Sequence, residues 1–292
     1  MIIRVRKMKI LVLGCNGMAG HMISVYFQEQ GHEVIGFARR KSKYVTTIVG
    51  DATEAHRIKE VLNGSTYDVV INCIGILNQF AEKYKARAVY LNSYLPHYIA
   101  TLLEGSSTRL FHMSTDCVFS GKRGQYTEYD FCDGTTFYDR TKAIGEVVDD
   151  KNLTLRQSIV GPDINPDGIG LLNWFMKQEG EIQGYTRAIW TGQTTLQLAK
   201  TMEWAAQEDV SGLINAVPAQ SISKYDLLKL FNRYIRSDAL LIQPVDKMAA
   251  DKSLICTRND YNLDIPDYEK MVSELASWMK SHSVMYPHYN LI

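Results

Sequence analysis

Short apolar segments alternate with longer amphipathic segments over the first half of this chain of 292 residues. The short segments are rich in aliphatic and β-branched residues and show no polar alternation, as is typical of parallel strands covered by helices on both faces. They predict strands at 9–13, 33–37, 46–49, 68–72 and 109–113. The amphipathic segments predict helices at about 18–30, 54–63, 79–103 and 136–150. We therefore predict an α/β fold, a Rossmann-like doubly wound parallel sheet with right-handed crossovers.

The pattern changes at the turn-forming segment 161–168, Gly-Pro-Asp-Ile-Asn-Pro-Asp-Gly. Beyond it, helical segments are predicted at about 170–178, 193–207, 222–235 and 267–281, with few strands between them. We predict a Rossmann domain over 8–160 and a smaller, mostly helical substrate lobe over 161–292, some of whose segments return to the first domain. Residues 1–7 add nothing to this pattern, and either Met1 or Met8 could be the natural start.

The composition excludes several classes of protein. Lys plus Arg and Asp plus Glu number 32 each, so no net field favours nucleic acid or an anionic membrane as a partner. The five cysteines are scattered without CxxC spacing, which argues against a disulfide framework or a zinc site. No acidic or histidine cluster suggests another metal. No secretion signal precedes the first strand, and no apolar run approaches the ~20 residues of a membrane span. We expect a cytoplasmic protein whose oligomeric state, with a homodimer as one candidate, stays open.

A glycine-rich loop follows the first predicted strand and leads directly into a helix. Its spacing is GxxGxxG, formed by Gly14, Gly17 and Gly20. Glycines here permit the tight turn, the approach of the pyrophosphate to the backbone and close helix packing. The free N–H groups of the helix N-terminus then bind phosphate. The loop predicts a dinucleotide site that includes Gly14, Asn16, Gly17 and Met18.

The end of the second predicted strand indicates which dinucleotide binds. An NAD site usually has an acidic residue there for the ribose 2′-OH, whereas this chain has Arg39 and Arg40. Arginine pairs well with a 2′-phosphate, so we expect NADPH/NADP+; a solvated basic turn is the alternative. Asp51 is placed to accept a hydrogen bond from the adenine amino group. Ala52, Asn72 and Gly75 complete the predicted cofactor contacts.

Two further segments carry candidate catalytic groups. Thr115 follows the fifth predicted strand, where ligands of open α/β sheets bind. Tyr138 and Lys142 are four residues apart on the next helix and share one face. A neighbouring ammonium lowers the pKa of a phenol, which would poise Tyr138 as general acid for a keto group, while Lys142 would also hold the nicotinamide ribose and Thr115 the keto oxygen.

A second YxxxK pair shows how easily the motif arises by chance among 17 tyrosines. Tyr225 and Lys229 have the same spacing, but no Ser/Thr-bearing strand end precedes them at a similar distance. We interpret this second pair as structural and the first pair as catalytic. His97 and His112 are interpreted as packed or surface histidines.

These segments resemble the extended short-chain dehydrogenase/reductase superfamily. The resemblance rests on the loop at 14–20, on 114–119, and on 138–142 followed by Gly145-Glu146. More closely, the chain is similar to the dTDP-4-dehydrorhamnose reductase family over nearly its whole length, including 155–156 and 192–199. The resemblance implies NADPH-dependent reduction of the 4-keto group of a nucleotide-linked 6-deoxysugar in bacterial polysaccharide biosynthesis, with Thr115, Tyr138 and Lys142 as the catalytic residues.

The chain departs from the family near the predicted sugar site. The family usually has tyrosine at Cys117, and often proline and glycine around the catalytic tyrosine, where this chain has Thr136, Phe137 and Asp139. The substrate is therefore left open between dTDP and UDP sugars. Asp116, Cys117 and Trp190 are candidate substrate contacts.

Two alternatives remain from the sequence. One is a sugar-nucleotide 4,6-dehydratase or epimerase of the same superfamily; against it, Cys117 stands where a dehydratase has glutamate, and the arginines disfavour a permanently bound NAD. The other is a regulatory subunit that binds NADP without catalysis; such proteins often lose the tyrosine or lysine, which this chain keeps.

Overall fold

The structure is a computed structural model that describes residues 6–291. Its centre is a seven-stranded sheet in the order β11-β6-β5-β4-β1-β2-β3, and every pair of neighbouring strands is parallel. The strands are β1 (Lys9–Leu13), β2 (Glu33–Ala38), β3 (Thr46–Val49), β4 (Val69–Asn72), β5 (Arg109–Met113), β6 (Leu153–Arg156) and β11 (Gly212–Asn215). The predicted fold class is confirmed. The expectation of no secretion signal rests partly on residues 1–5, which lie outside the described residues.

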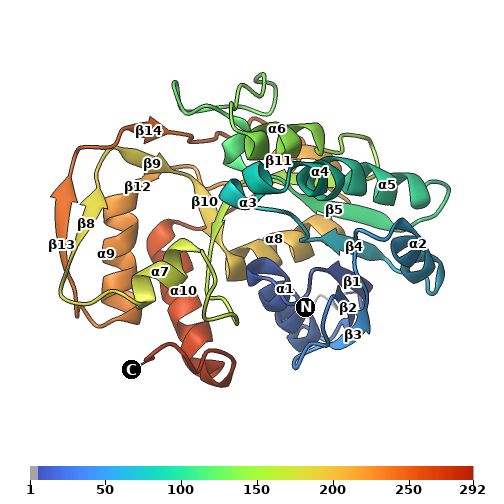
Figure 1. Ribbon diagram of the computed structural model, residues 1–292, viewed down its shortest axis with the longest axis horizontal. Helices are drawn as coiled ribbons and strands as arrows, with labels where there is room; N and C mark the ends of the chain where they lie inside the picture. Colours follow the sequence, from blue (N-terminus) through green and yellow to red (C-terminus); the bar gives the residue numbers. More distant parts are fainter. Residues whose placement is uncertain (1–5, 292) are drawn as a thin grey trace.

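Helices cover both faces of the sheet (Figure 1). Alternate residues of β1 point to opposite faces, because side chains along a strand alternate. Ile10 and Val12 pack with α1 (Met18–Glu29) and α8 (Thr195–Gln207), while Leu11 and Leu13 pack with α2 (Ala55–Asn63) and α5 (Leu95–Leu102). This two-sided burial explains why the strands read as continuous apolar runs.

The segment 79–103, predicted as one helix, is broken in the structure. It forms α3 (Asn78–Lys83), α4 (Lys85–Ala88), a π-helical stretch η1 (Val89–Tyr94) and α5. Pro96 lacks the N–H that would bond to the carbonyl of Asn92 in a regular α-helix. That carbonyl instead lies against Gly145, where a Cβ would come within 1.8 Å of it. Tertiary packing against the next helix has overridden the amphipathic pattern.

The helix α6 (Phe137–Ile144) begins with a capping box. The Thr136 hydroxyl accepts a hydrogen bond from the Asp139 N–H, and the Asp139 carboxylate accepts one from the Thr136 N–H, both at 3.1 Å. These two departures from the related family therefore start the helix that carries Tyr138 and Lys142.

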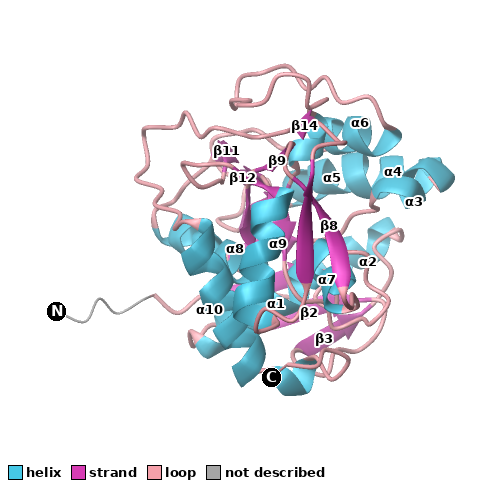
Figure 2. Cartoon of the chain, turned by 90° about the vertical axis from the view of Figure 1, so that its left-hand side faces the viewer, coloured by secondary structure: helices cyan, strands magenta, loops and turns pink. Residues whose placement is uncertain are grey.

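Much of the lobe beyond residue 160 stands beside the sheet (Figure 1), and its helices α9 (Lys224–Ile235) and α10 (Tyr268–Ser281) pack side by side (Figure 2). All four helices predicted there are present, the other two being α7 (Leu171–Met176) and α8. The lobe holds more strands than expected, because several are short and pair with distant segments. They are β8 (Glu181–Tyr185), β9 (Ala188–Trp190), β10 (Gly192–Thr194), β12 (Ile222–Ser223), β13 (Leu241–Val245) and β14 (Ala250–Asp251). The short β7 (Ser158–Val160) lies just before the lobe and pairs with β10.

Segments from beyond residue 160 also complete the sheet domain. β11 pairs with β6 at the sheet edge, and α8 packs against α1. Short 3₁₀ turns occur at η2 (Asp116–Val118) and η3 (Ser283–Met285). Within residues 6–291, no helix is both long and apolar enough to cross a membrane.

Candidate active site

The glycine loop lies at the point where strand order reverses, between β1 and its neighbours β2 and β4. Gly14 has φ +85°, a conformation that favours glycine, and its N–H donates to the Phe37 carbonyl over 2.8 Å. A Cβ on Gly20 would lie 2.1 Å from the Gly14 carbonyl oxygen, so only glycine lets α1 approach the turn. Gly17 is the N-cap of α1 and supplies no side-chain cap. The first N–H groups of α1 are therefore available for an anion.

The basic turn lies next to this loop. Arg39 and Arg40 are exposed at the end of β2, and the Asn16 side-chain amide donates to the Arg40 carbonyl over 2.8 Å. Met18 begins α1, and its sulfur approaches the position that a Cβ of Gly170 would take. The residues predicted to bind the pyrophosphate and the 2′-phosphate thus lie next to one another at the carboxyl ends of β1 and β2.

Asp51, the predicted adenine contact, follows β3. Its carboxylate accepts hydrogen bonds from the Thr53 N–H and hydroxyl, both at 2.9 Å, and lies 3.7 Å from the Arg87 guanidinium. The Thr53 N–H, followed by its hydroxyl and Arg87, lowers the pKa of this carboxyl. An ionised carboxylate is a suitable acceptor for an amino group. The neighbouring Ala52 is buried.

Thr115, Tyr138 and Lys142 meet where β5 ends and α6 packs against it. All three are buried, with exposed fractions of 8%, 7% and 5%. The Thr115 hydroxyl accepts the Cys117 N–H at 3.1 Å and caps η2. Burial raises the pKa of Tyr138, and Thr115 acts in the opposite direction. The phenol therefore keeps its proton at neutral pH.

The Lys142 amine has partners other than the phenol. Its Nζ donates to the Met113 carbonyl over 2.6 Å and lies 3.3 Å from His112 Nε2. Burial lowers the pKa of Lys142 to about 8, although Glu146 acts against it. In this structure the amine faces β5 and burial dominates the pKa of the phenol, so the expected effect of Lys142 on the pKa of Tyr138 stays a prediction.

The predicted cofactor contacts after β4 have mixed environments. The Asn72 side chain is fully buried and reaches His112 Nδ1 at 3.2 Å, so it faces the sheet interior. Gly75 is exposed in the loop after β4, and a Cβ there would lie 3.3 Å from the Asn92 side-chain oxygen. His112 is packed, as predicted, but its packing against Lys142 could not be inferred from spacing alone.

The sequence analysis missed two sets of hydrogen bonds that connect the elements around the candidate site. Asn92 accepts the Ile76 N–H at 2.8 Å and donates to the Ile76 carbonyl at 3.0 Å, fixing the loop after β4. The buried Arg156 and Glu146 form a two-point ion pair at 2.8 and 2.6 Å, and the Ser114 hydroxyl donates to Glu146 over 2.5 Å. This ion pair joins β6, the end of α6 and the end of β5.

The three candidate substrate contacts differ in exposure. Asp116 is 6% exposed, and burial raises its pKa, whereas Lys224 and Lys252 act to lower it. Burial likewise raises the pKa of the neighbouring Cys117 to about 12, so its thiol is unreactive. Two lysines of the C-terminal lobe thus place positive charge beside the end of β5, a feature that the sequence pattern did not indicate.

Trp190 is 4% exposed and packs in the core. Its ring lies 5.7 Å from that of Tyr268, and the Lys224 ammonium lies 5.8 Å from its centroid. It therefore supports the start of α9 and presents no free face for a nucleobase. This burial does not favour Trp190 as a substrate contact.

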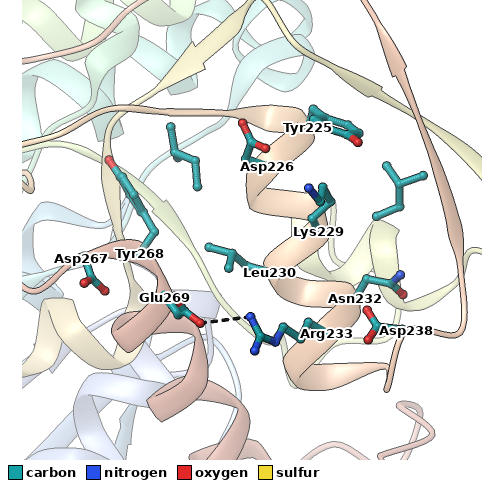
Figure 3. Close-up of a pocket in the computed structure, with 12 residues that line it drawn as sticks. Tyr225, Asp226, Lys229, Leu230, Asn232, Arg233, Asp238, Asp267, Tyr268 and Glu269 are labelled. Carbon is teal, nitrogen blue, oxygen red and sulfur yellow. Dashed lines mark hydrogen bonds and ion pairs between the residues drawn. The ribbon is translucent and has the colours of Figure 1, made fainter.

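A pocket of about 630 Å³ is lined by residues of α9 and of the start of α10 (Figure 3). Tyr225 and Lys229 line it, with the Lys229 ammonium 5.2 Å from the Tyr225 ring. Arg233 and Glu269 pair across it at 3.3 Å. None of its lining residues is a serine or threonine, and none is a predicted catalytic or cofactor-binding residue. Within residues 6–291, no group of three or more His, Cys, Asp or Glu side chains could hold a metal ion.

The family comparison covers the half of the chain that contains the predicted catalytic and cofactor-binding residues. The model of the family described as RmlD substrate binding domain matches residues 8–160. The chain belongs to this family. The matched residues include the glycine loop, the basic turn and α6, so all three candidate catalytic residues lie within the family match.

Individual relatives extend beyond the matched half. A probable low-salt glycan biosynthesis reductase of Haloferax volcanii is 28% identical over 251 residues, which cover 81% of this chain and 83% of that protein. A dTDP-4-keto-6-deoxy-D-glucose reductase of Streptomyces niveus is 24% identical, covering 80% and 81%. The solved structure of a Bacillus anthracis dTDP-4-dehydrorhamnose reductase in complex with NADP superposes with a TM-score of 0.75 at 18% identity, covering 92% and 98%. This last likeness supports the fold of the whole chain.

Proposed function

We propose that this protein is an NADPH-dependent reductase of the 4-keto group of a nucleotide-linked 6-deoxysugar. The observation that carries the proposal is that Thr115, Tyr138 and Lys142 are buried near the carboxyl end of β5, in the same parallel sheet whose strand β1 leads into the glycine loop. A buried acid, a hydroxyl and a nucleotide loop at one edge of a sheet are what ketone reduction requires. The reductases among the relatives support the same chemistry.

The residues present fit a dinucleotide. A side chain at Gly20 would collide with the turn, and the uncapped start of α1 offers N–H groups to a pyrophosphate. Arg39 and Arg40 are exposed beside it and suit a 2′-phosphate, which favours NADPH. When bound, NADPH supplies the hydride that reduces the keto carbon.

The chain's own residues supply the rest of the chemistry. The Tyr138 phenol is protonated at neutral pH and can donate its proton to the keto oxygen, although burial makes it a weaker acid than a free phenol. Thr115 lies beside it and can donate to the same oxygen. Lys142, four residues further along α6, can contact both the phenol and the ribose once its side chain turns from Met113.

The substrate class is inferred from charge. Lys224 and Lys252 lie close enough to Asp116 to act on its pKa, and they can attract the diphosphate of a sugar nucleotide to the end of β5. Whether the base is thymine or uracil stays open. We place the reaction in the cytoplasm and in surface-polysaccharide synthesis, consistent with five free cysteines and a relative named for glycan biosynthesis. A homodimer stays a candidate assembly.

The test is NADPH oxidation followed by absorbance with a panel of dTDP- and UDP-linked 4-keto-6-deoxysugars. We expect consumption with at least one sugar and none without sugar, and the active member names the nucleotide. Consumption with none of them, while NADPH binds, would contradict the proposal and favour a regulatory protein. Turnover of sugar without net NADPH consumption would indicate an epimerase.

A further inference from the structure

A chain of hydrogen bonds runs beneath the candidate catalytic residues. The Ile74 N–H donates to the side-chain oxygen Oδ1 of Asn72 at 3.1 Å, and the Asn72 side-chain nitrogen Nδ2 lies 3.2 Å from His112 Nδ1. His112 Nε2 lies 3.3 Å from Lys142 Nζ, which donates to the Met113 carbonyl at 2.6 Å. Asn72 and His112 are fully buried, so the chain is shielded from water.

The partners fix the direction of this chain. Because the Asn72 oxygen accepts from the backbone, its amide NH₂ faces His112 and must donate to Nδ1. A neutral imidazole that accepts at Nδ1 carries its proton on Nε2. That Nε2–H points at the Lys142 nitrogen, which can accept it only through the lone pair of the uncharged amine.

The surrounding charges agree with a neutral imidazole. Burial, the largest cause, lowers the pKa of His112 well below its ordinary value, and positive charge at Lys142 or His97 would lower it further. Around Lys142, burial lowers the pKa to about 8, while Glu146 just beyond α6 and Cys73 after β4 oppose the decrease.

We propose that His112 is a positioning residue for the active site: Asn72 fixes it as the Nε2–H tautomer, and its N–H holds the Lys142 amine beneath β5 and favours the uncharged form. Asn72 then acts through His112 in addition to any contact with the cofactor. The catalytic consequence rests on the proposed reductase function, but the tautomer can be tested without it.

The first experiment is ¹⁵N–¹H NMR of the histidine rings in protein labelled at its seven histidines. Comparison with His112→Gln identifies the His112 signals by their disappearance. We expect an Nε2–H tautomer with unprotonated Nδ1 that stays neutral from about pH 6 to about pH 8. An Nδ1–H tautomer, or an imidazolium in this range, would overturn the proposal whether or not the protein proves to be a reductase.

The second experiment separates positioning from packing by kinetics. His112→Leu removes the donor, whereas the amide of His112→Gln can still donate to Lys142. Without this donor the uncharged amine is less favoured, so the pKa of Lys142 rises in His112→Leu. The alkaline limb of the pH–rate profile, which follows deprotonation of Lys142, should therefore move upward by roughly half to one pH unit. We expect His112→Gln to retain the wild-type limb, and KM for the sugar to change little in either variant.

Coincident profiles for wild type and His112→Leu would contradict the positioning role, as would a downward shift. Thermal unfolding of both variants checks that they fold. If His112→Leu does not fold, the tautomer measurement on the wild-type protein still decides. A wild-type protein with the expected tautomer and no reductase activity would refute the proposed function alone.

Discussion

Tyr138 and Lys142 lie one turn apart on α6, yet their polar atoms have different environments. The phenol lies beside Thr115 and Cys117 at the end of β5, whereas the amine is bonded to Met113 beneath the strand. Burial moves the pKa of each toward its uncharged form, upward for the phenol and downward for the amine. The pair is therefore arranged to hold a proton on the phenol at neutral pH.

Replacing Tyr138 by phenylalanine tests the acid directly. The change removes one oxygen from a buried ring and leaves the packing, so NADPH affinity should remain close to wild type. Turnover should fall by roughly 10²–10⁴-fold, the usual contribution of a general acid. Tyr225→Phe, in the second YxxxK pair, is the matched control and should leave turnover unchanged. Rate measurements that show normal turnover in Tyr138→Phe would remove this residue from the mechanism.

Arg39 and Arg40 determine the cofactor in our account. Both are exposed at the end of β2 and are free to pair with a 2′-phosphate. Arg39→Ala combined with Arg40→Ala should weaken NADPH binding by about 10–100-fold, as expected for lost charge-assisted hydrogen bonds, and NADH binding much less. Titrations of both cofactors by fluorescence measure the ratio. An equal loss for NADPH and NADH would contradict the 2′-phosphate role.

At the level of elements, the turn from β1 to α1 couples cofactor binding to packing. Gly20 lies on the first turn of α1, directly against the Gly14 carbonyl. Close approach of helix and turn is possible only because neither residue adds a side chain between them. The same geometry that opens the phosphate site thus fixes how α1 covers the sheet.

We expect Gly20→Ala to lower the free energy of unfolding by about 1–3 kcal/mol, because the added methyl group must displace backbone. Gly17→Ala is the matched comparison: a Cβ there would lie 3.4 Å from the Gly14 oxygen, an ordinary contact. Chemical denaturation of both variants measures the difference. Equal stability of Gly20→Ala and the wild-type protein would show that the turn is less tightly packed than described.

Elements whose pattern reflects local burial were predicted well, and those set by distant partners were not. The strands at 9–13 and 109–113 agree with the structure because both of their faces are buried, whereas 46–49 forms the more exposed edge strand β3. The break in 79–103 depends on Gly145 of another helix, and β8 with β13 forms from segments about 60 residues apart. Neither contact leaves a periodic signal in the sequence.

The candidate site shows the same division. Motif spacing indicated Thr115, Tyr138 and Lys142, which meet at the end of β5. It could not reveal that Lys142 bonds to His112, because that contact depends on side-chain direction across two elements. It also placed Trp190 with the substrate, although tertiary packing against Tyr268 buries this ring.

Over the whole molecule, the C-terminal lobe adds to both the sheet and the crevice. β11 and α8 complete the sheet domain, while Lys224 at the start of α9 brings charge to the end of β5. The predicted boundary between residues 160 and 161 therefore marks a change in sequence pattern, but segments on both sides of it contribute to the sheet and to the candidate site. Cofactor and sugar nucleotide are proposed to meet where the two parts of the chain join.

The most direct measurement follows the hydride. The protein is incubated with a 4-keto sugar nucleotide and NADPH that carries deuterium at the transferring position of nicotinamide C4, and the sugar product is examined by NMR and mass spectrometry. Our account predicts one deuterium per product molecule, bonded to sugar C4, with an equal amount of NADP+ formed. A product without deuterium at C4, or deuterium that remains entirely in the cofactor while the sugar is converted, would contradict it.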